Sequence, residues 1–138
     1  MLKIVIASFI MVHGLVHLLY AAQGLKIFEL QPGMFWPKGS WIFSKVFADR
    51  KIQWLAAISC ILAAVGFVTG VIAVLLSQVW GELLITTVAG LSALIFILFW
   101  DGKLRNLDDK GGIGLLINIA ILIALHVLEW PDFDFAAY

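Results

Sequence analysis

Two histidines on one turn of an apolar segment are the first residues whose type and spacing could do chemistry. His13 and His17 are four residues apart, so in a helix both imidazole rings lie on the same face. Such a pair can bind a metal, but this HxxxH has no glutamate of the HExxH type and no third ligand nearby in the sequence. Gly14, between the two rings, would allow another helix or a ligand to approach closely.

A second group of ionisable residues falls toward the opposite end of the predicted helices. His126 and Glu129 are three residues apart, and Glu82 reaches a similar depth at a rise of about 1.5 Å per residue. A metal held by these three side chains is geometrically possible; the alternative is that both glutamates lie at the water interface. A single metal shared by His13, His17 and His126 would need unusual helix tilts, because His126 lies roughly 8 Å outward of His13, toward the outer face of the membrane.

Uncharged polar side chains form another pattern, with one in each of the four apolar segments at a common depth. This polar layer consists of His17, Ser59, Ser92 and Asn118. One interpretation is hydrogen bonding between helices, typically below about 1 kcal/mol per contact. The other is a polar patch that orients a small ligand inside an apolar pocket.

Composition indicates the environment in which these residues lie. Of 138 residues, 63% are hydrophobic and 13% are charged, and the mean hydropathy is +1.06. A soluble domain of this size could not bury so much apolar surface, which identifies an integral membrane protein. The formal net charge of zero gives no reason to expect a nucleic-acid partner, and Cys60, the one cysteine, cannot form an internal disulfide.

Four segments approach the length of about 20 apolar residues that a membrane-spanning helix needs. They are residues 3–22, 52–76, 79–100 and 113–130. Lipid offers no hydrogen bonds to the backbone, so each must be helical. The sequence predicts an all-α fold, a four-helix transmembrane bundle in a single domain, 1–138. Gly66 and Gly70 form a GxxxG motif, expected to pack a helix closely within the bundle or in a homodimer.

The basic residues predict how the helices are oriented. Eight of the nine lie in loops 23–51 and 101–112, and only Lys3 lies on the other side. The positive-inside rule therefore predicts cytoplasmic loops with both termini outside. The segment 40–49 contains aromatic residues and a lysine, and we expect a short interfacial helix there. The aromatic residues of the first loop act either as a membrane-interface belt or as a gate or docking surface.

Three short motifs resemble those of a group of small bacterial four-helix membrane proteins. They are a GLxHL-type first helix, a Ser-Lys element in the first loop and a WxDxK-type end to the third helix. The chain is also similar to the DoxX-like proteins in size and helix count. The resemblance implies a four-helix bundle in a bacterial inner membrane but no particular reaction. Its motifs correspond here to Gly14, His17, Ser44, Lys45, Trp100, Asp101 and Lys103. Trp100 is followed directly by Asp101, where relatives often have one more residue between.

Charged residues of the two loops suggest a separate contact on the cytoplasmic side. Asp101 and Lys103 follow the third helix, and Lys45 comes from the other loop on the same side. They are expected either to form an ion pair that ties the loops together, contributing less than about 1 kcal/mol, or to bind an anionic headgroup.

Three functions are compatible with these residues. The leading hypothesis is a non-enzymatic binding or accessory protein that holds a lipid, a quinone-like molecule or a partner helix against His17 and Asn118. The second is a membrane oxidoreductase, or a metal- or haem-binding protein, that uses the three histidines. The third is a small transporter or channel, although the interior has few charges for an ion path. The sequence demands no cofactor, and it shows no Ser–His–Asp arrangement for nucleophilic catalysis. The expected partners are the bilayer and either a second copy or another membrane protein.

Overall fold

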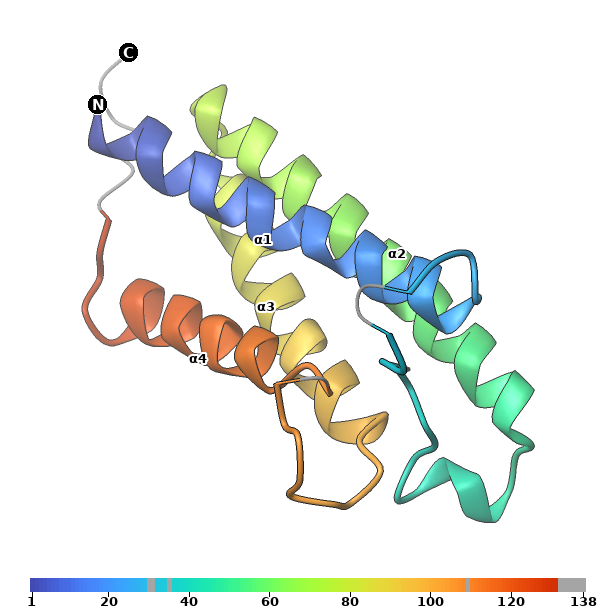
Figure 1. Ribbon diagram of the computed structural model, residues 1–138. Coiled ribbons are helices and arrows are strands. Elements are labelled where there is room, and N and C mark those ends of the chain that lie inside the picture. Colours follow the sequence, from blue (N-terminus) through green and yellow to red (C-terminus); the bar gives the residue numbers. More distant parts are fainter. Residues whose placement is uncertain (30–31, 35, 109, 132–138) are drawn as a thin grey trace.

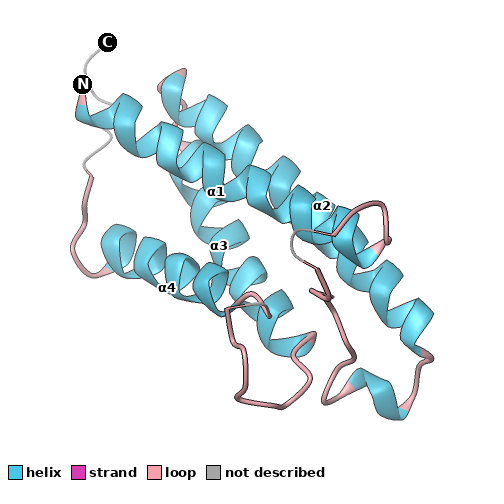
Figure 2. Ribbon diagram, in the orientation of Figure 1, coloured by secondary structure: helices cyan, strands magenta, loops and turns pink. Residues whose placement is uncertain are grey.

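The long apolar segments form α-helices in the computed structural model, which describes residues 1–29, 32–34, 36–108 and 110–131. No strand occurs within these ranges (Figures 1 and 2), and the all-α prediction is confirmed. The helices are α1 (Leu2–Gly24), α2 (Asp49–Leu75), α3 (Trp80–Leu98) and α4 (Gly112–His126). The first three are long and apolar enough to span a membrane, which supports a helical membrane protein.

The fourth helix is shorter than predicted. It has 15 residues, which corresponds to about 22 Å against a bilayer core of about 30 Å. Pro131 disfavours helical geometry at the residue before it, and Glu129 adopts a left-handed φ of 47°. The backbone N–H groups of Leu128 and Trp130 fold back onto carbonyl oxygens of the last helical turn. These local effects end α4 four residues before the expected boundary at residue 130.

The first loop also differs from the expected continuous helix over 40–49. It contains one turn of 3₁₀-helix, η1 (Phe43–Lys45), and α2 begins at Asp49. The hydroxyl of Ser40 explains part of this conformation, because it accepts hydrogen bonds from the backbone N–H groups of Ile42 and Phe43. Hydroxyl groups that bond nearby backbone in this way compete with regular helix formation.

Each helix packs against the next one along the chain: α1 on α2, α2 on α3 and α3 on α4. Figure 1 shows α1 and α2 running side by side in opposite directions, with α4 at the far side of α3. The face of α2 toward its neighbours is rich in small buried residues, which permit close backbone approach. They include Ala56, Ala57, Cys60, Ala63 and Ala64.

The predicted GxxxG motif packs within the chain, against α3. A Cβ atom added at Gly66 would lie 2.5 Å from Cγ2 of Val88, and one at Gly70 would lie 2.8 Å from Cγ1 of Ile85. On the opposite side of this contact, a Cβ at Gly81 would lie 2.7 Å from the backbone nitrogen of Val74. The three glycines therefore let α2 and α3 approach more closely than any larger residue would allow.

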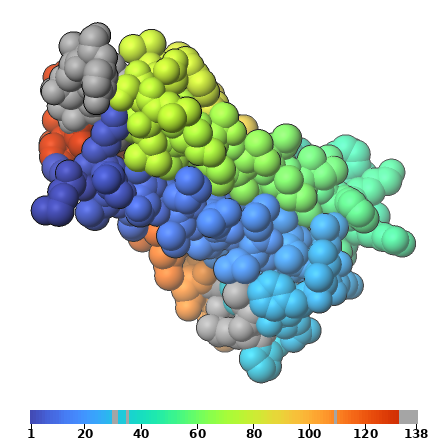
Figure 3. Space-filling view, turned by 90° about the horizontal axis from the view of Figure 1, so that it is seen from above, coloured from blue at the N-terminus to red at the C-terminus, as the bar shows by residue number. Residues whose placement is uncertain are grey.

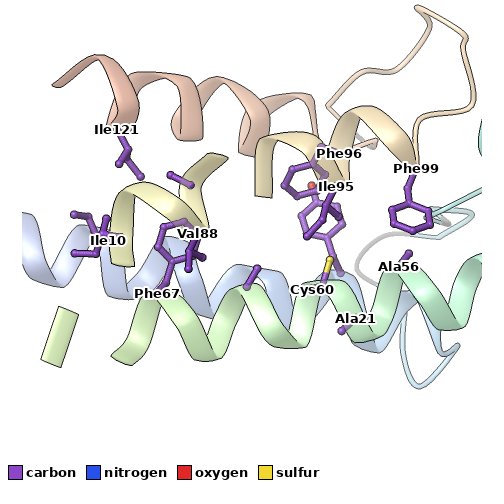
Figure 4. Close-up of a cluster of buried hydrophobic side chains, with 14 of the residues drawn as sticks. Ile10, Ala21, Ala56, Cys60, Phe67, Val88, Ile95, Phe96, Phe99 and Ile121 are labelled. Carbon is purple, nitrogen blue, oxygen red and sulfur yellow. The ribbon is translucent and has the colours of Figure 1, made fainter. Parts of the chain in front are cut away.

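The core is continuous and mainly apolar, and much of the outer surface is apolar too. Figure 4 shows Phe67 and Val88 side by side, with Phe96 and Phe99 farther along the same core. Large aliphatic side chains such as Leu62, Leu83 and Leu116 remain exposed. Figure 3 shows α1 in blue and α2 in green packed closely side by side. An apolar exterior around an apolar core is the pattern expected of helices surrounded by lipid.

Candidate functional site

A hydrogen-bonded group of four polar side chains lies inside the apolar core. Nε2 of His13 is 2.9 Å from Oδ1 of Asn118, whose side-chain nitrogen is 2.7 Å from Oγ of Ser92. That hydroxyl oxygen is in turn 2.5 Å from Nε2 of His17. All four side chains are buried, and Ser92 and Asn118 have no solvent-accessible surface. We call these residues the polar network; it joins α1, α3 and α4.

Donor and acceptor chemistry fixes a direction around the polar network. Oδ1 of Asn118 only accepts, so Nε2 of His13 donates, and the Asn118 amide then donates to Ser92. Nδ1 of His17 lies 3.0 Å from the carbonyl oxygen of His13 and must donate to it. With Nδ1 protonated in a neutral ring, Nε2 of His17 accepts the hydroxyl hydrogen of Ser92. The network closes through the backbone carbonyl of His13, with the His17 ring neutral, as an apolar interior favours.

Helical geometry and small residues bring these groups together. The i, i+4 spacing puts both histidines on the same face of α1, with their ring centroids 5.1 Å apart. Phe67 of α2 packs against both rings. This contact requires a glycine at position 14, because a Cβ atom added to Gly14 would lie only 2.5 Å from the Cβ atom of Phe67. Gly14 thus makes room for a packing contact with α2 and lies beside the polar network without adding a polar group to it.

The structure gathers three of the four residues predicted to form the polar layer. His17, Ser92 and Asn118 are joined, but the hydroxyl of Ser59 donates to the carbonyl oxygen of Leu55 in its own helix. His13 takes the remaining place, although the sequence suggested it only as a metal ligand. Counting residues along each helix identifies side chains at a similar depth in the membrane, but it contains no information on how each helix is rotated. Helix rotation decides that His13 and not Ser59 belongs to the polar network.

Of the residues predicted as metal ligands, His13 and His17 are adjacent, but the others are not brought to them or to one another as a metal site. Glu82 is half-buried on α3, whereas His126 and Glu129 are exposed. Across the described part of the chain, no three His, Cys, Asp or Glu side chains lie close enough to hold a metal ion. Both ring nitrogens of His17 already take part in hydrogen bonds, so a metal or haem iron there would have to displace one of them.

An apolar groove runs beside the polar network, between α1 and α4. Its volume is about 400 Å³, and its lining is almost entirely apolar. The walls include Ile10, Ile117 and Ile121, which are close neighbours of His13 and Asn118 in their helices. Ile10 and Ile121 are three positions from His13 and Asn118, so the polar network lies about one helical turn from the lining of this groove.

The first loop attaches firmly to the carboxyl end of α3. The Ser40 hydroxyl donates to the carbonyl oxygen of Leu98 at 2.5 Å, and the Trp41 indole donates to that of Ile97 at 2.9 Å. The backbone N–H of Trp41 donates to the carbonyl oxygen of Trp100. Carbonyl groups at the end of a helix have no partner within it, so the loop supplies the cap. These bonds also place the two long loops at the same end of the molecule.

Aromatic residues of the first loop have two different environments. Trp36 is 1% exposed, and its ring contacts those of Tyr20, Phe96 and Phe99. Trp41 remains about half exposed. The belt interpretation therefore suits Trp41, whereas Trp36 is part of the core and closes this end of the helices. Phe35, another aromatic residue of the loop, lies outside the described residues.

The charged contact predicted between the two loops is instead formed within the second loop. Nζ of Lys110 lies 3.0 Å from Oδ1 of Asp101, while Lys45 and Lys103 are exposed. Partial burial would raise the pKa of Asp101, but the backbone N–H of Lys103 and the ammonium group of Lys110 outweigh it, and the pKa is lowered. The pair closes the loop that leads from α3 into α4.

Like the buried Ser40, Gln23 was not predicted from the sequence to be buried. It lies in the last turn of α1 and is 1% exposed, yet neither atom of its side-chain amide has a hydrogen-bond partner among the described residues. A glutamine near the end of an apolar segment resembles an interfacial residue, so the sequence gives no signal of its burial.

The chain matches no protein-family model, no curated protein sequence and no solved structure. Its function must therefore be inferred from the chemistry and placement of its own side chains.

Proposed function

We propose that this is a non-enzymatic membrane protein that binds a quinone-like lipid in the groove between α1 and α4. The observation that carries the proposal is the position of the groove, an apolar space of about 400 Å³ directly beside the polar network. Ligand sites commonly combine an apolar lining with a few polar groups that fix orientation.

The polar network supplies a hydrogen-bond donor for a carbonyl-bearing ring. The N–H of His13 is held by the carboxamide oxygen of Asn118 at 2.9 Å. A ligand carbonyl that passed between Ile10 and Ile121 would compete for this donor and release Asn118 to rearrange. Ordinary acyl chains lack such an acceptor within the bilayer core, so this contact would distinguish a quinone-like ring from bulk lipid.

The histidines support the alternative functions less well. Ligation of a metal or haem iron by His17 would break one of its two hydrogen bonds. It would also leave a buried group unpaired, at a cost of about 1–3 kcal/mol. A transport path would have to cross the same closed network. A ligand carbonyl in the groove would also break one hydrogen bond, between His13 and Asn118, but it would replace the acceptor of His13 and leave both hydrogen bonds of His17 in place.

The proposed setting is a bacterial inner membrane in which all four helices form a bundle. Both termini face outward, and loops 23–51 and 101–112 face the cytoplasm, as their basic residues suggest. Attachment of Trp41 to the end of α3 fits this arrangement, as does the Lys3–Ser77 hydrogen bond at the opposite end. In this setting, segment 40–49 lies at the membrane interface.

Native mass spectrometry of protein extracted in mild detergent, combined with ultraviolet absorption, tests this function. We expect an adduct of lipid mass with the absorption of a quinone. Ala124→Trp fills the groove and should remove the adduct, because Ala124 lines it. Leu116→Trp is the matched control on the exposed face of the same helix and should retain it. Protein without an adduct, or an adduct that survives Ala124→Trp, would refute the proposal.

A further inference from the structure

The buried amide of Gln23 is incompletely satisfied. Its side-chain nitrogen and oxygen are both sealed from solvent and lack hydrogen-bond partners among the described residues. Leaving one buried polar group unpaired costs about 1–3 kcal/mol. Native proteins rarely retain such a group unless a water, an ion or a ligand supplies the missing bonds.

Gln23 lies in the wall of a cavity that also has charged groups. The volume is about 410 Å³, and the other lining residues are Lys26, Phe28, Glu29 and Met34. The cavity therefore combines a cation, an anion and a carboxamide with two large apolar side chains. It lies where α1 ends at Gly24, which is the level of the lipid headgroups if α1 crosses the bilayer.

We propose that this cavity binds a phosphoethanolamine group, a phosphate linked to a primary ammonium, as the headgroup of a phospholipid. The Glu29 carboxylate accepts from the ammonium group, and Lys26 binds the phosphate. The Gln23 amide, which has no accessible surface in the unliganded cavity, is exposed when the lining side chains move apart around the headgroup, and it then donates to an ester carbonyl of the glycerol. Phe28 and Met34 contact the start of the acyl chains. Opposite charges on one cavity wall suit a zwitterion better than an anion such as phosphatidylglycerol.

This site is separate from the groove between α1 and α4. Ile10, in the groove, and Gln23 are thirteen positions apart in the same helix, or about 20 Å. The inference does not depend on the proposed quinone-like ligand, and each site has its own variants. Loss of one ligand with retention of the other identifies which proposal has failed.

The test is native mass spectrometry after incubation with equal amounts of phosphatidylethanolamine, phosphatidylcholine and phosphatidylglycerol of matched chains. We expect the ethanolamine adduct to dominate. Gln23→Leu should reduce its binding about tenfold, equivalent to losing about 1.4 kcal/mol. Gln78→Leu is the control, because Gln78 is exposed in the turn between α2 and α3. Equal adducts of all three lipids, or an unchanged preference in Gln23→Leu, would overturn the proposal.

A second variant tests headgroup chemistry separately from folding. Glu29 is exposed, so Glu29→Gln should fold normally and abolish the preference for ethanolamine over choline. A preference that survives this change would also overturn the proposal.

Glycerophosphoethanolamine, which has no acyl chains, distinguishes whether the phosphoethanolamine group comes from a lipid or from a soluble molecule. If glycerophosphoethanolamine fails to compete with phosphatidylethanolamine at equal concentration, the ligand is a lipid. If the two compete equally, the same headgroup chemistry is recognised in a soluble ligand.

Discussion

The hydroxyl oxygen of Ser92 on α3 lies 2.5 Å from Nε2 of His17 on α1, inside a core that is otherwise mainly apolar. Apolar contacts alone leave a helix free to rotate or slide, because lipid and core offer similar surroundings. A buried hydrogen bond between two defined atoms removes this freedom. Asn118 extends the same constraint to α4, so the polar network sets the register of three helices.

Loss of Asn118 should destabilise the fold more than loss of another polar residue from a helix. Asn118→Leu leaves the His13 N–H without its acceptor and Ser92 without a donor. The expected decrease in unfolding free energy is about 1–3 kcal/mol, measured by thermal or denaturant unfolding in detergent. Ser59→Ala is the control, since its hydroxyl bonds only within its own helix. The change there should stay within about 0.5 kcal/mol. Equal effects would show that the network contributes nothing specific.

The sequence predicts the helices well because their signal is local. Long apolar runs, separated by the charged first loop or by the short polar turn at Ser77 and Gln78, locate α1, α2 and α3 to within a few residues. The error at the end of α4 has a local origin too. Pro131 lies just beyond the predicted boundary and disfavours helical geometry at Trp130. A prediction that ends the helix before a proline is therefore closer to the observed end of α4.

The site is predicted less completely because it depends on helix rotation. Depth along each helix correctly groups His17, Ser92 and Asn118, but the same count includes Ser59 and omits His13. When a segment is apolar on nearly every face, its sequence does not specify the inward face. The burial of Gln23 and Trp36 likewise depends on how the first loop folds back over the end of the helices, which has no local signal.

Two glycines in α3 should respond oppositely to the same substitution. A Cβ at Gly81 would lie 2.7 Å from the backbone nitrogen of Val74, whereas none of the surrounding atoms lies within 4 Å of a Cβ at Gly90. We expect Gly81→Ala to destabilise the protein by about 1–3 kcal/mol through overpacking. Gly90→Ala should be neutral or stabilising by up to about 1 kcal/mol through helix propensity. Unfolding of both variants in one detergent is the measurement, and a neutral Gly81→Ala would contradict the close packing of α2 on α3.

The Ser40 hydroxyl should be needed to hold the first loop on the end of α3. Ser40→Ala removes the donor to Leu98 and the acceptor for two loop N–H groups. The change should increase amide hydrogen exchange in residues 41–46 by about tenfold, equivalent to about 1.4 kcal/mol of local stability. Thr87→Ala removes a hydroxyl bonded within its own helix and serves as the control. Unchanged exchange in Ser40→Ala would mean that the indole and backbone bonds of Trp41 suffice.

The Asp101–Lys110 pair should make the second loop sensitive to acid. The pKa of Asp101 is lowered in the folded protein, so folding favours the ionised carboxylate. Its stabilisation is complete above the ordinary aspartate pKa of about 3.9 and is lost as the pH falls through the lower, folded value. The effect should be below about 1 kcal/mol, because the pair is only partly buried and lies in a loop near solvent. Hydrogen exchange of residues 102–108 at pH 6 and pH 3 measures this effect. The wild type should lose protection between pH 6 and pH 3. Asp101→Asn should already have lower protection at pH 6 and should lose little more at pH 3. The same pH dependence in both proteins would assign the acid sensitivity to another group.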